Sequence, residues 1–179
     1  MFEGLKETLT GTERIYEGRM INLRRDTVQL PNGKASTREV IEHPGAIAVV
    51  PVLPDGRIVL VRQFRHPVAD VLLEIPAGKL SPGEDPNLCA HRELEEETGY
   101  VAGKMQKMTS IFTAPGFTDE VIHIYLAGDL RPTKQQTDED EFIEVEIYPA
   151  NEVLEMIRTS QIRDAKTIAG FLLSQTWPR

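Results

Sequence analysis

Three glutamates near the middle of the chain, Glu93, Glu96 and Glu97, have the type and spacing of metal ligands. In a helix over residues 86–98, Glu93 and Glu97 lie one turn apart on the same face, and Glu96 flanks them. Like charges at this spacing destabilise a helix, and bound Mg²⁺ would offset the repulsion because it prefers carboxylate oxygens. Arg92 is placed to hold Glu96, four residues later. A solvated acidic helix face is the alternative interpretation of this segment taken alone.

The flanking residues predict where this helix begins and ends. Asp85 is suited to the N-cap, and Pro86 to the first helical position. Gly99 stands where a C-terminal cap glycine is expected. Ala90 and Leu94 lie beside the acidic stripe and are expected to anchor the helix on a sheet.

The rest of the pattern predicts a mixed α+β fold in which short strands precede and follow this helix. A loop rich in Pro and Gly is expected over residues 76–83, before the helix, and a polar loop over residues 135–141, between the last two strands. Strands are expected over residues 46–52, 58–64, 71–75, 105–113, 121–127 and 142–148, and two closing helices over 150–159 and 164–175.

The N-terminal residues predict an antiparallel β meander. Strand-like runs occur over residues 14–17, 20–23, 27–30 and 36–42, and Asn32-Gly33 is a strong hairpin turn. His43-Pro44-Gly45 then breaks the pattern. We therefore expect two domains, a meander over residues 1–43 and a larger domain over residues 44–179.

Composition excludes several classes of protein. The 179 residues are 40% hydrophobic and 27% charged, as in ordinary globular proteins, and the formal net charge is −8. The sequence has no cluster of Lys and Arg that would indicate a nucleic-acid partner, and it has no apolar stretch long enough to indicate a membrane span. The N-terminal residues do not resemble a secretion signal. Cys89 stands alone, so a cytoplasmic location without disulfides is expected, and a small helix residue is favoured over a catalytic thiol.

The region around the acidic helix resembles the Nudix box. Gly78 is followed by five residues and Glu84, then by seven residues and Arg92-Glu93-Leu94-Glu95-Glu96-Glu97-Thr98-Gly99-Tyr100. Every fixed polar and glycine position of the box is present. Tyr100 is the single departure, because the family usually has an aliphatic residue at that packing position.

Membership of the Nudix family implies an α/β/α sandwich with a mixed sheet, extended here by the N-terminal meander. It also implies cleavage of nucleoside diphosphates linked to another moiety, with divalent cations, for which we expect Mg²⁺, with Mn²⁺ as a substitute. By position, Glu93 and Glu97 are the main metal ligands, and Glu96 assists. The main-chain carbonyl of Ala77 is a further ligand, and Glu84 either stabilises the loop or reaches the metal through water.

Other segments resemble the ADP-ribose pyrophosphatase subfamily. Pro115 lies sixteen residues after Gly99, at the distance that marks this subfamily, although a simple turn would also place a proline here. Residues 36–40, 45–51, 61–65 and 72–78 resemble its sequence before the box. The resemblance implies hydrolysis of ADP-ribose to AMP and ribose 5-phosphate.

The same resemblance implies the residues that contact the substrate and the water. The acidic loop, residues 138–141, is expected to carry the general base at Glu139 and a metal ligand at Glu141. For Arg38 and Arg65, surface ion pairs are the alternative, and for the acidic loop a solvated charge run. The expected substrate contacts are Arg38, Glu39, Arg65, Glu74, Lys79, Ala114, Pro115 and Gly116.

The subfamily also implies a homodimer that exchanges N-terminal strands, in which Tyr16 would stack on adenine unless it is an ordinary strand aromatic. Three other functions stay open. The substrate could be another nucleoside diphosphate sugar such as GDP-mannose, or a mutagenic nucleotide, although enzymes of the latter kind are usually shorter and have no meander. A non-catalytic nucleotide-sensing module typically lacks box glutamates, and all are present here.

Overall fold

The computed structural model describes residues 2–178, which form two compact units. One contains residues 2–44 and 112–121, and the other contains residues 45–111 and 122–178. Met1 and Arg179, the terminal residues of the two expected domains, lie outside the described residues. Each unit is considered by itself below.

The first unit contains an antiparallel meander of three strands, β1 (Thr8–Glu17), β2 (Asn22–Gln29) and β3 (Ala35–Glu42), after a short 3-10 turn over Glu3–Leu5. The expected hairpin at Asn32-Gly33 is confirmed, with Gly33 at a φ of 82° that favours glycine. The strand-like runs expected over residues 20–23 and 27–30 are in fact parts of one strand. The charged residues between them can stay in the ladder because their charges are paired, as in the ion pair of Arg25 with Glu13 at 2.6 Å.

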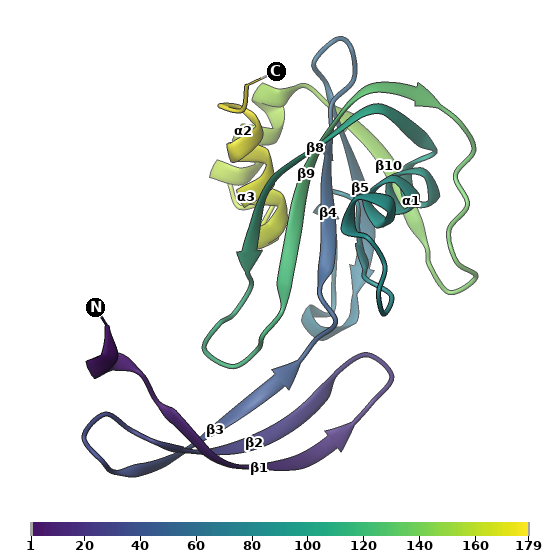
Figure 1. Ribbon diagram of the computed structural model, residues 1–179. Helices are drawn as coiled ribbons and strands as arrows, with labels where there is room; N and C mark the ends of the chain where they lie inside the picture. Colours follow the sequence, from purple (N-terminus) through teal and green to yellow (C-terminus); the bar gives the residue numbers. More distant parts are fainter. Residues whose placement is uncertain (1, 179) are drawn as a thin grey trace. The chain divides into compact units, whose positions relative to one another are not determined.

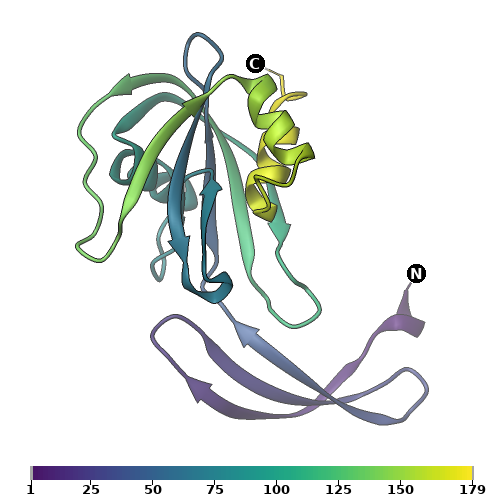
Figure 2. The same cartoon turned by 180° about the vertical axis from the view of Figure 1, so that it is seen from behind.

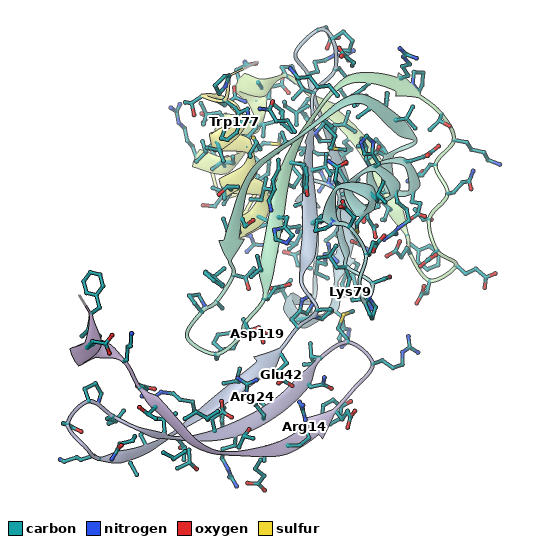
Figure 3. The ribbon with its side chains drawn as sticks, in the orientation of Figure 1. Arg14, Arg24, Glu42, Lys79, Asp119 and Trp177 are labelled. Carbon is teal, nitrogen blue, oxygen red and sulfur yellow. The ribbon has the colours of Figure 1, made fainter. Side chains whose placement is uncertain are left out.

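Charged side chains also link the three strands across the meander. Figure 3 shows Arg14 and Arg24 both pointing toward Glu42, and both form ion pairs with it. Arg24 also donates to Asp26 at 3.0 Å, and Thr12 donates to the same carboxylate at 2.7 Å. Cross-strand pairs of opposite charge stabilise a sheet that buries little apolar surface.

The segment 112–121 belongs to the same unit because its backbone bonds to β3. Ile41 donates its N–H to the Phe117 carbonyl at 2.8 Å, and Asp119 donates to the Ile41 carbonyl at 3.2 Å. The Asp119 carboxylate accepts the N–H of His43 at 2.9 Å. The loop that carries Pro115 is thereby tied to the end of the meander.

The second unit has two sheets, ordered β10-β5-β6 and β7-β4-β9-β8, and β4 is parallel to β9 while the other registered pairs are antiparallel. Helix α1 (Pro86–Thr98) lies on one side of β4 and β9, and α2 (Ala150–Arg158) and α3 (Ala165–Ser174) lie on the other (Figures 1 and 2). The strands are β4 (Ala46–Pro51), β5 (Ile58–Arg65), β6 (Asp70–Glu74), β7 (Ala77–Lys79), β8 (Tyr100–Phe112), β9 (Val121–Pro132) and β10 (Ile143–Tyr148), and a 3-10 turn covers His66–Val68.

Strand β4 shows why this unit is a sandwich. Its residues are buried on both faces, which explains the unbroken apolar run in the sequence. Ile47 and Val49 pack in the cluster that contains Ala90 and Leu94 of α1, whereas Ala48 and Val50 pack with residues of α2 and α3. The predicted α/β/α sandwich with a mixed sheet and an N-terminal meander is confirmed.

Three element predictions needed correction. Residues 77–79 form β7 rather than part of a loop, because the edge of β4 supplies backbone partners that local propensity does not reveal. Strand β8 begins at Tyr100 instead of residue 105, and as the outer strand of its sheet it tolerates exposed polar residues such as Lys104. Strand β9 continues past Ala127 to Pro132, with Asp129 at a φ of 53°.

Candidate active site

Helix α1 has the expected ends and the expected buried face. The Asp85 carboxylate accepts the N–H groups of Asn87 at 2.7 Å and Leu88 at 3.3 Å, and Gly99 closes the helix at a φ of 68°. Ala90 and Leu94 are fully buried. This burial fixes the helix on the sheet and leaves its acidic residues along the adjoining face.

Arg92 gathers the carboxylates of the box. It bonds to Glu93 at 2.7 Å and to Glu96 at 3.0 Å, which confirms the expected pair. Its other nitrogens bond to Glu84 at 3.1 Å, and Glu84 also accepts the Ser81 N–H at 2.9 Å. The hydrogen bond from Ser81 lowers the pKa of Glu84, which therefore braces the loop before the helix as a carboxylate.

Strand β7 brings the backbone against Glu93 and Glu97. Gly78 pairs with Ile47 of β4, and a Cβ added at Gly78 would overlap the Glu93 carboxylate. The Ala77 N–H donates to the Glu97 carboxylate at 3.2 Å. The box glycine is therefore required by a close approach of backbone to carboxylate.

The carboxylates of this site are buried far more than is usual for glutamates. Glu97 is 3% exposed, and burial, together with the nearby charge of Glu93, raises its pKa to about 8. Burial also raises the pKa of Glu93 and of Glu141, and the charge of Glu141 contributes to the shifts of Glu93 and Glu97. Three acidic groups from α1 and the acidic loop thus share one poorly hydrated space.

These residues fit a divalent cation, although within residues 2–178 no three acidic, His or Cys side chains converge as a finished metal site. Glu93 and Glu96 are instead both paired with the Arg92 guanidinium. Buried like charges favour a cation strongly, and carboxylate oxygens suit hard divalent ions. A metal site that includes the Ala77 carbonyl requires the Glu93 carboxylate to lie against this stretch of backbone. The close approach of Glu93 to Gly78 places it there.

The acidic loop is anchored on the C-terminal end of α1. Thr133 donates to the Gly99 carbonyl at 2.7 Å, Gln136 to the Glu96 carbonyl at 3.0 Å, and the Gln135 side chain to the Glu97 carbonyl at 2.7 Å. These bonds satisfy carbonyls that lack partners inside the helix. Beyond them Glu139 is exposed, whereas Glu141 is half-buried and interacts with the α1 carboxylates.

Three expected substrate contacts, Arg65, Glu74 and Lys79, belong to the same unit as this site. Arg65, at the end of β5, donates from Nε and Nη2 to both oxygens of Glu74, at 2.9 and 2.8 Å. Arg65 also interacts electrostatically with Glu97 and Glu141. Lys79 is exposed at the end of β7, one residue after Gly78, and is labelled in Figure 3.

The other expected substrate contacts belong to the meander unit. Arg38 forms an ion pair with Glu7 and donates to Ser36 at 3.1 Å, and Glu39 is exposed on the same strand. Tyr16 is 58% exposed on β1. In the loop tied to β3, Pro115 and Gly116 are exposed and Ala114 is partly buried.

Sequence reasoning missed two side chains near this site, Gln135 and Lys166. Gln135 bridges α1 and β10, because it also donates to the Ile143 carbonyl at 3.3 Å. Lys166 reaches Glu74 from α3. Neither belongs to a local pattern, since each partner lies far away along the chain.

Two smaller expectations agree with the structure. Cys89 is buried, and burial raises the pKa of its thiol to about 12, which suits a small helix residue rather than a nucleophile. Tyr100 packs against the cluster that holds α1, as a packing position should. Among residues 2–178, no helix is long and apolar enough to cross a membrane.

A mixed α/β/α sandwich that places buried glutamates of a short helix against a glycine-containing strand defines a class of hydrolases that act with divalent metals. The chain belongs to the Nudix family, because residues 42–171 match the model of the NUDIX domain. Residues 7–41 match a second model, the nucleoside diphosphate sugar hydrolase N-terminal domain.

Named relatives support the assignment to the Nudix family. The chain is 47% identical to an ADP-ribose pyrophosphatase of Bacillus subtilis (strain 168), over 92% of this chain and 90% of that protein. It is 45% identical to a methanol dehydrogenase activator of Bacillus methanolicus, over 91% and 89% of the two chains. It is 40% identical to an ADP-ribose pyrophosphatase of Mycobacterium tuberculosis, over 93% and 81%. A GDP-mannose pyrophosphatase of Yersinia enterocolitica is less similar, at 37% over 73% of each chain.

The fold is also that of a solved structure, described as the crystal structure of an ADP compounds hydrolase. The two structures superpose with a TM-score of 0.85, and the match covers 96% of this chain and 94% of the other at 23% sequence identity. This similarity extends over both units of the chain and supports the fold.

The close approach of Gly78 to the Glu93 side chain predicts the effect of adding one methyl group at Gly78. Gly78→Ala should displace the Glu93 carboxylate and raise the dissociation constant of Mg²⁺, measured by calorimetry, by about tenfold or more. Gly128→Ala is the matched control, because a Cβ at Gly128 meets nothing within 4 Å. Equal Mg²⁺ affinity in the two variants would show that this close approach does not position a ligand.

Proposed function

We propose that this Nudix hydrolase cleaves the diphosphate of ADP-ribose to AMP and ribose 5-phosphate with Mg²⁺, for which Mn²⁺ can substitute. The observation that carries the proposal is the buried carboxylate site, in which Glu93 of α1 lies against Gly78 of β7 and Glu97 accepts the N–H of Ala77. Relatives that share 47% and 40% identity and are named ADP-ribose pyrophosphatases support this substrate.

The chemistry follows from the residues of the site. A bound divalent cation supplies neutralisation of the diphosphate charge and a lower pKa of water. Glu93, Glu97 and the Ala77 carbonyl would hold it, with Glu96 and Glu141 assisting. Arg65 would bind the phosphates, since a planar guanidinium can donate two hydrogen bonds to one phosphate. Phosphoryl transfer then depends mainly on positioning and electrostatics.

We assign the general base to Glu139 of the acidic loop. Its exposed side chain is compatible with a loop that closes over bound substrate, and the loop is anchored on α1 by Gln135 and Gln136. Glu141 is the nearer of the two to the α1 carboxylates, which suits a metal ligand.

The substrate would be a small nucleoside diphosphate sugar. Its expected contacts are Arg65, Glu74 and Lys79, together with Arg38, Glu39 and the segment Ala114–Gly116. GDP-mannose is the competing substrate, and lower identity to the relative with that name disfavours it. A non-catalytic module is disfavoured because Glu93, Glu96 and Glu97 are all retained.

We further propose a homodimer built through the meander. All ten residues of β1 are exposed, and the strand pairs only with β2 among the described residues. Leu9, Ile15 and Tyr16 are 58%, 47% and 58% exposed there, and exposed apolar side chains on an edge strand favour a protein partner. A cytoplasmic location is compatible with the buried reduced Cys89.

Product analysis tests the substrate. Purified protein with Mg²⁺ should release AMP from ADP-ribose faster than it cleaves GDP-mannose, UDP-glucose, diadenosine polyphosphates or 8-oxo-dGTP, as measured by chromatography of the products. Faster turnover of another compound would refute the ADP-ribose assignment and leave the metal-dependent chemistry standing.

Two variants of the acidic loop separate the base from the metal ligand. Glu139→Gln should lower kcat about 100-fold or more with little change in KM, because a general base acts only in the transition state. Glu141→Gln should instead raise the Mg²⁺ concentration that gives half-maximal activity. The assignment of the base would be wrong if Glu139→Gln kept its kcat while Glu141→Gln lost it.

A further inference from the structure

Glu74 is a buried carboxylate held by two cations at once. Its side chain, at the end of β6, is 1% exposed. Arg65 binds both of its oxygens, at 2.9 and 2.8 Å, and the Lys166 ammonium forms an ion pair with Oε2 from α3. Burial alone would raise the pKa of Glu74, but the hydrogen bonds from Arg65 and Lys166 hold it below its usual value.

Lys166 is fixed by the first turn of α3. Its Nζ lies 3.1 Å from Asp164, the N-cap of the helix, and its side chain is 11% exposed. Asp164 accepts the N–H of Thr167 at 2.9 Å and its hydroxyl at 2.6 Å. The same hydroxyl accepts the Ile75 N–H at 2.9 Å, directly after β6. The start of α3 is therefore locked to the residues around Glu74.

The second cation changes what Arg65 can do. A single arginine would already neutralise Glu74, so the addition of Lys166 leaves Arg65, Glu74 and Lys166 together with a net positive charge. Asp164, the N-cap of α3, supplies a second negative charge, so the four groups together are formally neutral, and without Lys166 they would be net negative. Arg65 uses Nε and Nη2 for Glu74, which commits two of its five N–H groups and leaves the Nη1 edge for another acceptor.

Arg65 is also the member of this group that faces the carboxylate site. It is 37% exposed, whereas Glu74 is buried, and it interacts with Glu97 and Glu141. A guanidinium that is rigidly held and keeps its Nη1 edge for another acceptor is suited to an anion beside a metal site, because little reorganisation is needed when the anion binds.

We propose that Lys166 is a positioning residue for substrate binding: by sharing the charge of Glu74, it keeps Arg65 fixed and available to a substrate phosphate. This inference rests on the proposed function, since it needs a diphosphate substrate that Arg65 contacts. Lys166 itself is placed behind Glu74 and acts only through it.

Three substitutions at Lys166 separate charge from packing. Lys166→Met keeps the length of the side chain, Lys166→Gln keeps a hydrogen-bond donor without the charge, and Lys166→Arg keeps the charge. The Met and Gln variants should raise KM for ADP-ribose about tenfold or more with a much smaller change in kcat, and the Arg variant should restore most of the loss. If the Met variant does not fold, the Gln and Arg variants carry the test.

Arg163→Met is the matched control for a merely structural role. Arg163 lies just before α3 and forms a 2.5 Å ion pair with Asp70 of β6, so it joins the same two segments at an exposed position. Its removal should leave KM unchanged. Thermal unfolding of each variant, without substrate, reports the structural contribution separately.

Binding of the α,β-methylene analogue of ADP-ribose, measured by calorimetry with Mg²⁺, gives a readout that does not need turnover. Weaker binding by Lys166→Gln than by Arg163→Met supports the inference. Equal KM and equal analogue binding in the unaltered enzyme and Lys166→Gln would overturn this inference and leave the proposed function standing. Absence of ADP-ribose turnover by the unaltered enzyme would overturn the proposed function, and this inference with it.

Discussion

Repulsion between buried carboxylates is the constraint on which the rest of this structure depends. Glu93 and Glu97 lie on one face of α1, and Glu141 is a third acidic group whose charge contributes to raising the pKa of both. In water such charges would separate, but here Ala90 and Leu94 hold the helix on the sheet. The packing of the core thus keeps the acidic groups close together. Burial disfavours the charged form of each group, but together they suit a divalent cation.

Several groups offset this repulsion without removing it. Arg92 pairs with Glu84, Glu93 and Glu96, and the Ala77 N–H donates to Glu97. Bonds from the segment 133–136 to the carbonyls at the end of α1 bring the acidic loop to the same place. On another side, the cations on Glu74 extend positive charge toward the site. The result is a region where a metal and an anionic diphosphate can be accommodated together.

The sequence predicted α1, both of its caps and the pair of Arg92 with Glu96, because these depend on residues within a few turns of one helix. The long apolar run of β4 also predicted a buried strand, whereas the α/β/α sandwich was implied by the resemblance to the Nudix family. Strand β7 was missed, because its pairing depends on a distant strand edge. Lys166 was missed for a similar reason, as its partner Glu74 lies in a different element and no spacing rule connects them.

The central claim is that the glutamates of α1 hold the metal used for diphosphate hydrolysis. It is tested most directly by the Mg²⁺-dependent turnover of ADP-ribose in Glu97→Gln, compared with Glu95→Gln as the same change on the same helix. Glu95 lies near the Thr133 hydroxyl, at 3.3 Å, rather than in the carboxylate site. The account predicts a loss of about 1,000-fold in kcat/KM for Glu97→Gln and little change for Glu95→Gln. Comparable activity in the two variants would contradict it.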